Sequence, residues 1–140
     1  MFKKILVALD GSESSWEALA VALDIAKRYG AELHSISVEE HLPHYGATVG
    51  EVVEAKEEEN RHFARIAEEA KSRATAAGGA LECHVIPGHR VETITEFARE
   101  RGVDLIVLGH KTRAGFFSML WDTTARIATR FAPCSVLVVK

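Results

Sequence analysis

The 140-residue sequence is poor in cysteine and proline, with two and three copies respectively. Cys83 and Cys134 are far apart and lie in apolar segments, which is typical of buried thiols in a reducing compartment and argues against a disulfide framework. No apolar run approaches membrane-spanning length, and the short run that begins at Ile5 is too short for a secretory signal. We therefore expect a soluble, cytoplasmic protein.

Excess charge of one sign is also missing. Seventeen basic and twenty acidic residues give a net charge of −3, with the two signs mixed along the chain. Proteins that bind nucleic acids or anionic membranes normally concentrate positive charge, so we expect neither partner. Repeats, low-complexity segments and linkers are absent too, and the length suits a single domain spanning residues 1–140.

The sequence does contain a regular alternation of strand-like and helix-like segments. Helical spacing of apolar residues predicts helices at about residues 12–29, 51–77, 91–101 and 123–131, and Ser14 and Glu17 fit a capping box for the first of them. Apolar runs predict strands at residues 4–9, 32–38, 81–86, 104–108 and 135–139. The first, fourth and fifth runs are almost continuously aliphatic, which is typical of strands covered on both faces. The pattern therefore predicts an α/β fold with a doubly wound parallel sheet.

The junction after the fourth strand is the most informative segment. In doubly wound sheets, ligands bind outside the carboxyl ends of the strands where the strand order reverses, so a cleft is expected between Asp10 and the segment that starts at Gly109. The next helix begins with free N–H groups that attract anions. However, Asp122 lies near the start of that helix, where a phosphate would otherwise bind.

Four motifs spread over nearly the whole chain carry a family resemblance. They are residues 5–13, the Gly88 turn after the third strand, residues 104–110 and residues 132–139. In this order and spacing they resemble the universal stress protein family. The resemblance implies a Rossmann-like five-stranded sheet of order 3-2-1-4-5 with helices on both faces, in a protein that is commonly dimeric and that binds ATP in some members only.

The resemblance also implies which residues face a nucleotide. Members that bind ATP share a loop of glycine, two residues, glycine, nine residues, glycine, and then serine or threonine. Gly109 matches the first glycine and Thr123 the hydroxyl residue, but Thr112 and Asp122 replace the other two glycines. On the base side, the expected residues are Ala8, Asp10 and Val38. Asp10 could contact a ribose hydroxyl or a metal ion, or could simply be a turn residue before the first helix.

The two replacements weaken a phosphate site. A β-branched Thr112 at positive φ would cost on the order of 1–2 kcal/mol. Asp122 could accept the N–H groups that a phosphate needs, and like charges about 4 Å apart repel by roughly 4 kcal/mol at an effective dielectric constant of about 20. Lys111 and Arg113 could instead hold phosphate oxygens, or be solvated loop charges, and Thr123 and Thr124 could bind phosphate or cap the helix.

We therefore expect a non-enzymatic stress-response or regulatory protein in which ordinary ATP binding is weak or absent. The alternative is a genuine ATP- or AMP-binding member that uses Lys111 and Arg113 in place of the missing glycines. Catalysis would amount to a weak ATPase at most, because an ATPase needs a metal site and a positioned water, and only Asp10 is an obvious contributor. The sequence also shows no nucleophile elbow and no serine–histidine–acid set. We predict no metal site: His41 and His44, with His34 nearby, are loosely spaced, and His84 suits a core or sheet-edge role.

Two segments point to protein partners. If residues 135–139 form an edge strand, their aliphatic ladder needs a cover, and pairing with the same strand of a second copy would provide it. We therefore expect a homodimer through this strand. An apolar cluster in the loop could form a surface for another protein, or could pack beneath the loop. It comprises Phe116, Phe117, Met119, Leu120 and Trp121.

Overall fold

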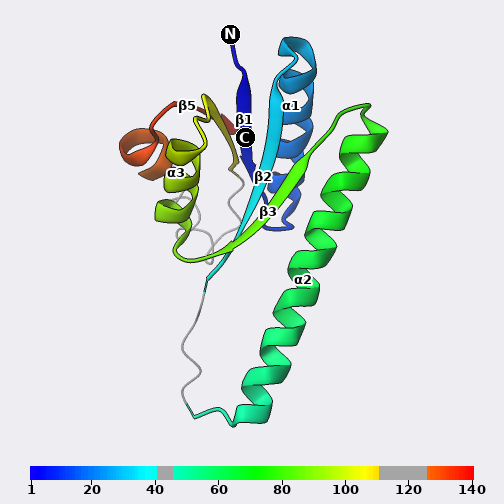
Figure 1. Cartoon of the computed structure of the whole chain (residues 1–140), viewed down its shortest axis with the longest axis vertical. Coiled ribbons are helices and arrows are strands. Elements are labelled where there is room, and N and C mark those ends of the chain that lie inside the picture. Colours follow the sequence, from blue (N-terminus) through cyan, green and yellow to red (C-terminus); the bar gives the residue numbers. More distant parts are fainter. Residues whose placement is uncertain (41–45, 111–125) are drawn as a thin grey trace.

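The computed structural model describes residues 1–40, 46–110 and 126–140. Its strands form one five-stranded parallel sheet in the order β3-β2-β1-β4-β5, which confirms the predicted fold class and strand order (Figure 1). The strands are β1 (Lys4–Ala8), β2 (Glu32–Glu39), β3 (Glu82–Pro87), β4 (Leu105–Gly109) and β5 (Ser135–Val139).

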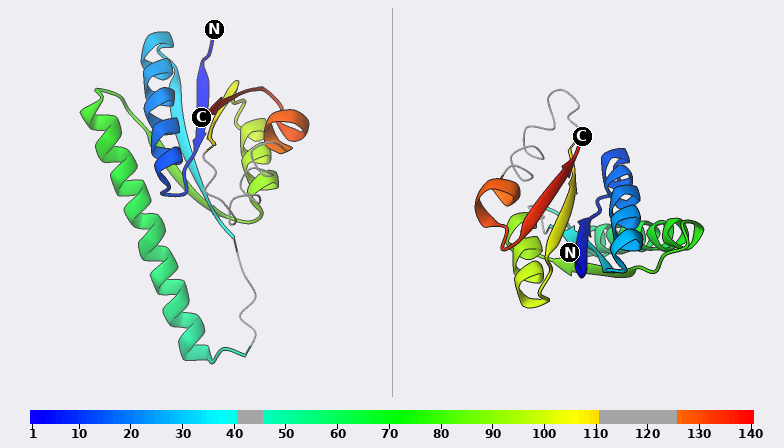
Figure 2. Two further views of the ribbon diagram at one scale, coloured as in Figure 1. Left: turned by 180° about the vertical axis from the view of Figure 1, so that it is seen from behind. Right: turned by 90° about the horizontal axis from the view of Figure 1, so that it is seen from above.

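Helices cover both faces of the sheet, as predicted (Figure 2). One face carries α1 (Glu13–Tyr29) and α2 (Val49–Ala76), and the other carries α3 (Arg90–Glu100) and the short π-helix η1 (Ile127–Phe131). The long helix α2 extends well beyond the sheet at its amino-terminal end, and its buried residues begin only at Ile66 (Figure 1).

The core consists of two apolar layers separated by the sheet. Ile5 and Val7 face α1 and α2, whereas Leu6 faces α3, as the alternation of side chains along a strand requires. All three are fully buried, so β1 is covered on both faces as expected. The same expectation is wrong for β5, whose valines and leucine are only half-buried, because β5 is the last strand of the sheet.

The capping box predicted at Ser14 is wrong, because α1 is capped two residues earlier, at Ser12. Ser12 has extended backbone dihedrals, and its hydroxyl accepts the N–H of Ser15 at 3.3 Å. Gly11, with φ of +83°, makes the turn that places Ser12 there. The helix therefore starts at Glu13, directly after the end of β1.

The end of the third strand also differs from the prediction. The strand predicted at residues 81–86 extends to Pro87 in β3, which tolerates a proline because it is an edge strand. Phe131, the last residue of the helix predicted at 123–131, is 38% exposed. It stands where η1 leads into the edge strand β5, and the guanidinium groups of Arg126 and Arg130 lie over its ring.

Candidate functional site

The predicted cleft lies at the carboxyl edge of the sheet, where β1 has β2 on one side and β4 on the other. The chain order reverses between β1 and β4, which is the position at which doubly wound sheets bind ligands. The edge is held together beyond the strands, since the N–H of Leu9 donates to the carbonyl of Ile36 at 2.9 Å. The structure thus places the ends of β1, β2 and β4 side by side.

The two apolar residues assigned to the base side come from neighbouring strands. Ala8 and Val38 are both half-buried and both pack against the apolar layer beneath α3. Ala8 pairs with Ile36, two residues before Val38 in β2. The structure therefore brings this part of the predicted site together as a small apolar surface.

Asp10 takes part in the turn that leads into α1. One of its carboxylate oxygens accepts the N–H of Ser12 at 2.9 Å. This contact is the Asx-turn arrangement typical of a short acidic side chain before a helix.

Gly109 is required by packing as well as by any ligand. A Cβ at this position would overlap the carbonyl oxygen of Ser14 in the first turn of α1. The next residue is held too, because the N–H of His110 donates to the carbonyl of Val139 at 2.8 Å. This glycine therefore permits α1 to approach β4 whether or not a phosphate binds beside it.

The rest of the predicted phosphate loop, and the apolar cluster of residues 116–121, lie outside the described residues. The roles assigned to these loop residues thus stay predictions. The residues concerned are Lys111, Thr112, Arg113, Asp122, Thr123 and Thr124.

Two glutamates that the sequence analysis overlooked lie at the same carboxyl edge. Glu39 is only 7% exposed and its carboxylate is 3.0 Å from the Lys56 ammonium. Glu40 accepts the N–H of Arg90 at 3.3 Å, at the start of α3, where the N-cap His89 makes no side-chain cap. A carboxylate thus already binds at one helix N-terminus that could attract an anion. The only signal in the sequence was their position at the end of a predicted strand.

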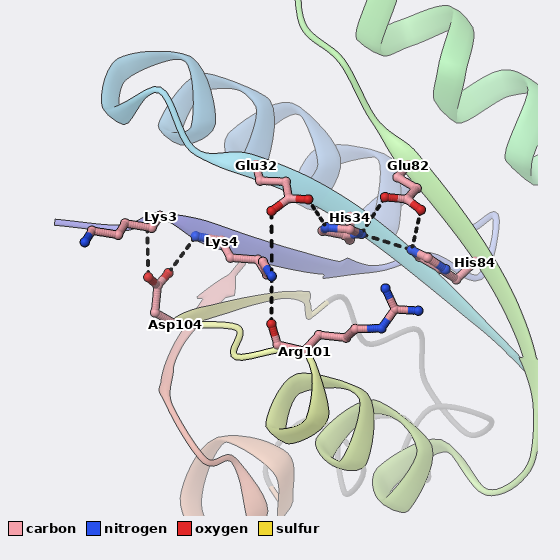
Figure 3. Close-up of polar contacts among 8 residues, drawn as sticks. All are labelled: Lys3, Lys4, Glu32, His34, Glu82, His84, Arg101 and Asp104. Atoms are coloured by element: carbon pink, nitrogen blue, oxygen red, sulfur yellow. Dashed lines mark hydrogen bonds and ion pairs between the residues drawn. The ribbon is translucent and has the colours of Figure 1, made fainter.

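The opposite, amino edge of the sheet carries a different polar network (Figure 3). The Asp104 carboxylate accepts the N–H groups of Lys3 and Lys4 at 2.9 and 3.2 Å. The Lys4 ammonium donates to the carbonyl of Arg101 at 2.8 Å and lies 3.7 Å from Glu32. These contacts tie the start of β1 to the turn between α3 and β4.

Histidines gather at this amino edge as well. His34 lies buried in β2 beside His84 of β3, whereas His41 and His44 lie outside the described residues. His84 is half-buried on an edge strand. No sequence signal linked the two histidines, because only strand pairing brings them together.

Both cysteines are free thiols that pack against the apolar layers. Burial raises the pKa of Cys134, the nearby Asp104 carboxylate adds to the increase, and a hydrogen bond from the Ile106 backbone opposes it. Cys134 therefore stays a protonated thiol near neutral pH. Within the described parts of the chain, no helix is both long and apolar enough to cross a membrane.

Comparison with known proteins agrees with the fold and the motifs. The model of the universal stress protein family matches residues 1–140. Universal stress protein YxiE of Bacillus subtilis is 30% identical over 148 aligned positions that cover all of both chains. The solved universal stress protein UspA of Lactobacillus plantarum is 25% identical, covers 99% of this chain with 98% of its own, and superposes with a TM-score of 0.83.

A second solved structure is a universal stress protein in complex with cAMP. It is 27% identical, covers 99% of this chain with 97% of its own, and has a TM-score of 0.77. The full-length family match, the identity to curated relatives and the superposition on solved members lead to one conclusion. The chain belongs to the universal stress protein family.

Proposed function

We propose that this protein is a regulatory binding protein of the universal stress type, acting by binding rather than by catalysis, whose cleft binds ATP weakly or not at all. The observation that carries the proposal is the acidic character of the cleft. Glu40 binds the first N–H of α3, and Asp10 lies at the turn after β1. The sequence adds Asp122 at a position where ATP-binding members have glycine.

Electrostatic repulsion is large enough to weaken ATP binding strongly. A polyphosphate placed beside an ionised carboxylate about 4 Å away is repelled by roughly 4 kcal/mol at an effective dielectric constant of about 20. Each 1.4 kcal/mol changes affinity about tenfold, so one such carboxylate is enough to remove the usual affinity for ATP. Lys111 and Arg113 can offset part of this repulsion if they reach the phosphate.

A second candidate function is the binding of an adenine nucleotide with fewer phosphates. The solved relative with cAMP shares 27% identity with this chain. The apolar surface of Ala8 and Val38 suits the face of a base, and a single phosphate suffers less repulsion than a triphosphate. In this case Lys111 and Arg113 would serve as the phosphate contacts.

Calorimetric titration separates the two candidates. We expect little or no heat when ATP with Mg²⁺ is added to the wild type, and a gain of at least about tenfold in affinity for Asp122→Gly, because the repelling carboxylate is removed. Adding Thr112→Gly should increase the affinity further. The exposed Asp24 of α1 provides the control, since Asp24→Ala removes a negative charge far from the cleft.

The outcomes are distinct. Tight binding of ATP by the wild type would overturn the proposal and favour the genuine ATP-binding alternative. Binding of AMP or cAMP by the wild type, with ATP still excluded, would establish the second candidate. Equal gains for Asp122→Gly and Asp24→Ala would show that only net charge matters.

We also propose that the protein is a cytoplasmic, single-domain homodimer that pairs through β5. This edge strand presents Val136, Leu137, Val138 and Val139, all only half-buried. An uncovered aliphatic edge invites pairing with another strand. The loop cluster of residues 116–121 stays a candidate surface for a different protein.

Sedimentation velocity tests the dimer. We expect Val138→Lys on β5 to yield a monomer, because the charged side chain opposes strand pairing. The matched control is Val85→Lys, since Val85 is 42% exposed on β3 at the other edge of the sheet. A monomeric wild type, or loss of the dimer only in Val85→Lys, would refute pairing through β5.

A further inference from the structure

Two neighbouring strands begin with the same glutamate–any–histidine pattern. Glu32 and His34 belong to β2, and Glu82 and His84 belong to β3. Alternate residues of a strand share a face, and the register places His34 opposite Glu82. All four side chains therefore gather at the amino edge of the sheet, on the side of α3 (Figure 3).

The distances among three of these side chains fit a shared ligand. His34 Nδ1 lies 3.0 Å from His84 Nε2 and 3.4 Å from a Glu82 carboxylate oxygen. His84 Nε2 lies 4.0 Å from the other Glu82 oxygen. In a tetrahedral zinc site with bonds of about 2.0–2.1 Å, two ligand atoms are separated by roughly 3.3 Å. Small side-chain shifts would complete such a site.

The fourth side chain determines which His34 nitrogen faces the group. His34 Nε2 lies 3.1 Å from the Glu32 carboxylate. The contact is short but poorly aligned, and the buried Nε2 makes no hydrogen bond of good geometry. A proton on Nε2 leaves Nδ1 with a lone pair directed at His84 and Glu82. Orientation of a histidine ligand by a carboxylate on its other nitrogen is a common arrangement in metal sites.

When the proton of the neutral His34 imidazole is on Nε2, Nδ1 and the facing carboxylate oxygen of Glu82 are both acceptors. In that tautomer a cation between the two atoms replaces their repulsion by attraction. The imidazole nitrogen that binds a metal ion is the one that carries no proton.

The proposed ligands are buried on one side and exposed to solvent on the other. His34 is 2% exposed, and the Phe97 ring of α3 lies 4.8 Å from the His84 ring between their centroids. The side chains of Glu82 and Glu32 are 61% and 57% exposed, so an ion can enter from solvent. Arg101, stacked over Phe97, opposes the positive charge of an ion and moderates its affinity.

We propose that His34 Nδ1, His84 Nε2 and the Glu82 carboxylate bind a divalent transition-metal ion of the zinc type, with water as the fourth ligand and Glu32 as a positioning residue. Two imidazoles and one carboxylate suit zinc better than magnesium or calcium, which prefer oxygen ligands. The ion joins the edge strand β3 to β2. The site is independent of nucleotide binding, because it lies at the opposite edge of the sheet.

Titration of the purified, chelator-treated protein with Zn²⁺ and with Co²⁺ tests the site. We expect one Zn²⁺ per chain by calorimetry and the visible absorption of tetrahedral Co²⁺, displaced by Zn²⁺. His84→Ala should abolish both signals, and Glu32→Gln should weaken Zn²⁺ binding by about 10–100-fold without removing the Co²⁺ spectrum. The control is His89→Ala, because His89 is an exposed histidine that makes no side-chain cap.

Each outcome decides the proposal. The proposal is overturned if the wild type does not bind Zn²⁺ stoichiometrically. It is also overturned if His84→Ala still binds Zn²⁺, because the ion would then belong to other histidines. If His84→Ala is unfolded by circular dichroism, Glu82→Gln replaces it, since its side chain is largely exposed. Loss of tetrahedral Co²⁺ absorption in folded Glu82→Gln, with His89→Ala unchanged, supports the site.

Discussion

The two edges of the sheet are built in different ways. At the carboxyl edge, backbone conformation and close approach dominate: Gly11 has φ of +83°, and Gly109 leaves space for the Ser14 carbonyl. At the amino edge, side chains of the strands themselves interact, as Asp104 does with the Lys3 and Lys4 backbone and His34 with His84.

From this difference we expect that residues at one edge can be replaced without altering the other edge. The carboxyl edge depends on the segments that follow β1 and β4, so replacing loop residues can alter a ligand without changing the sheet. The amino edge depends on strand register, so its chemistry changes only when strand residues change. The carboxyl edge carries acidic groups where the fold offers an anion site, and the amino edge carries histidines where no family ligand is implied.

Among the variants at the two edges, Gly109→Ala should lower protein stability the most. The new Cβ would press against backbone atoms rather than against a movable side chain. We expect the free energy of unfolding to fall by about 3 kcal/mol, measured by urea denaturation. The control is Gly50→Ala in the first turn of α2, where the new Cβ meets only Thr48 Oγ1 at 4.0 Å. In that variant the free energy of unfolding should rise by about 0.5–1 kcal/mol. Equal stability of the two variants would contradict the packing role of Gly109.

Asp104→Ala tests the amino edge and should have the next largest effect. Two backbone N–H groups lose their acceptor, and we expect a loss of about 1–2 kcal/mol in the free energy of unfolding. Asp24→Ala serves as the matched control, because its ion pair with Arg28 is exposed and screened by solvent. A cost no larger than that of the control would show that water replaces the lost contacts.

Glu40→Gln tests whether negative charge at the carboxyl edge disfavours anion binding. The variant loses the negative charge at the start of α3, and we expect a decrease of less than about 1 kcal/mol in stability. Anion affinity at this edge should increase, because the remaining amide repels a phosphate less. Titration with inorganic phosphate measures the change, and unchanged affinity would show that Glu40 does not face the cleft ligand.

The smallest expected effect on stability comes from ionisation of the Cys134 thiol, and it depends on pH. Because its folded-state pKa is raised, the folded state holds the proton more tightly than the unfolded state. Its contribution to stability is therefore lost only as the pH rises past the ordinary thiol pKa of the unfolded chain. Alkylation of the native protein should be slow near neutral pH and accelerate at higher pH than for a free cysteine. Asp104→Ala should shift that profile downward, and an unshifted profile would exclude the carboxylate's influence.

The parallel sheet and the alternation of its strands with helices could be predicted because burial determines them, whereas the strand order was implied by the family resemblance. Aliphatic runs such as Leu105 to Leu108 must be covered on both faces, and alternation with helices leaves few topologies. The capping of α1 by Ser12 could not be predicted, because it depends on the turn at Gly11. Pro87 was misassigned because tolerance of proline depends on which strand is at the edge.

The same distinction applies to the sites. Ala8 and Val38 were identified through family motifs and lie together as implied, although their contact with a nucleotide stays a prediction. The sequence assigned Gly109 to a phosphate-binding loop. Its packing against Ser14 could be recognised only from the structure. The histidine group was overlooked, since His34 and His84 are 50 residues apart and only the pairing of β2 with β3 joins them.

The amino-acid sequence by itself determined the family and the parallel sheet, because hydrophobic periodicity and short motifs are local properties. The nucleotide-type cleft stays a prediction from the same motifs. Tertiary structure alone decided which polar side chains meet across strands and which backbone atoms approach a glycine. Such contacts depend on strand register and helix docking, and both follow from the packing of the whole core.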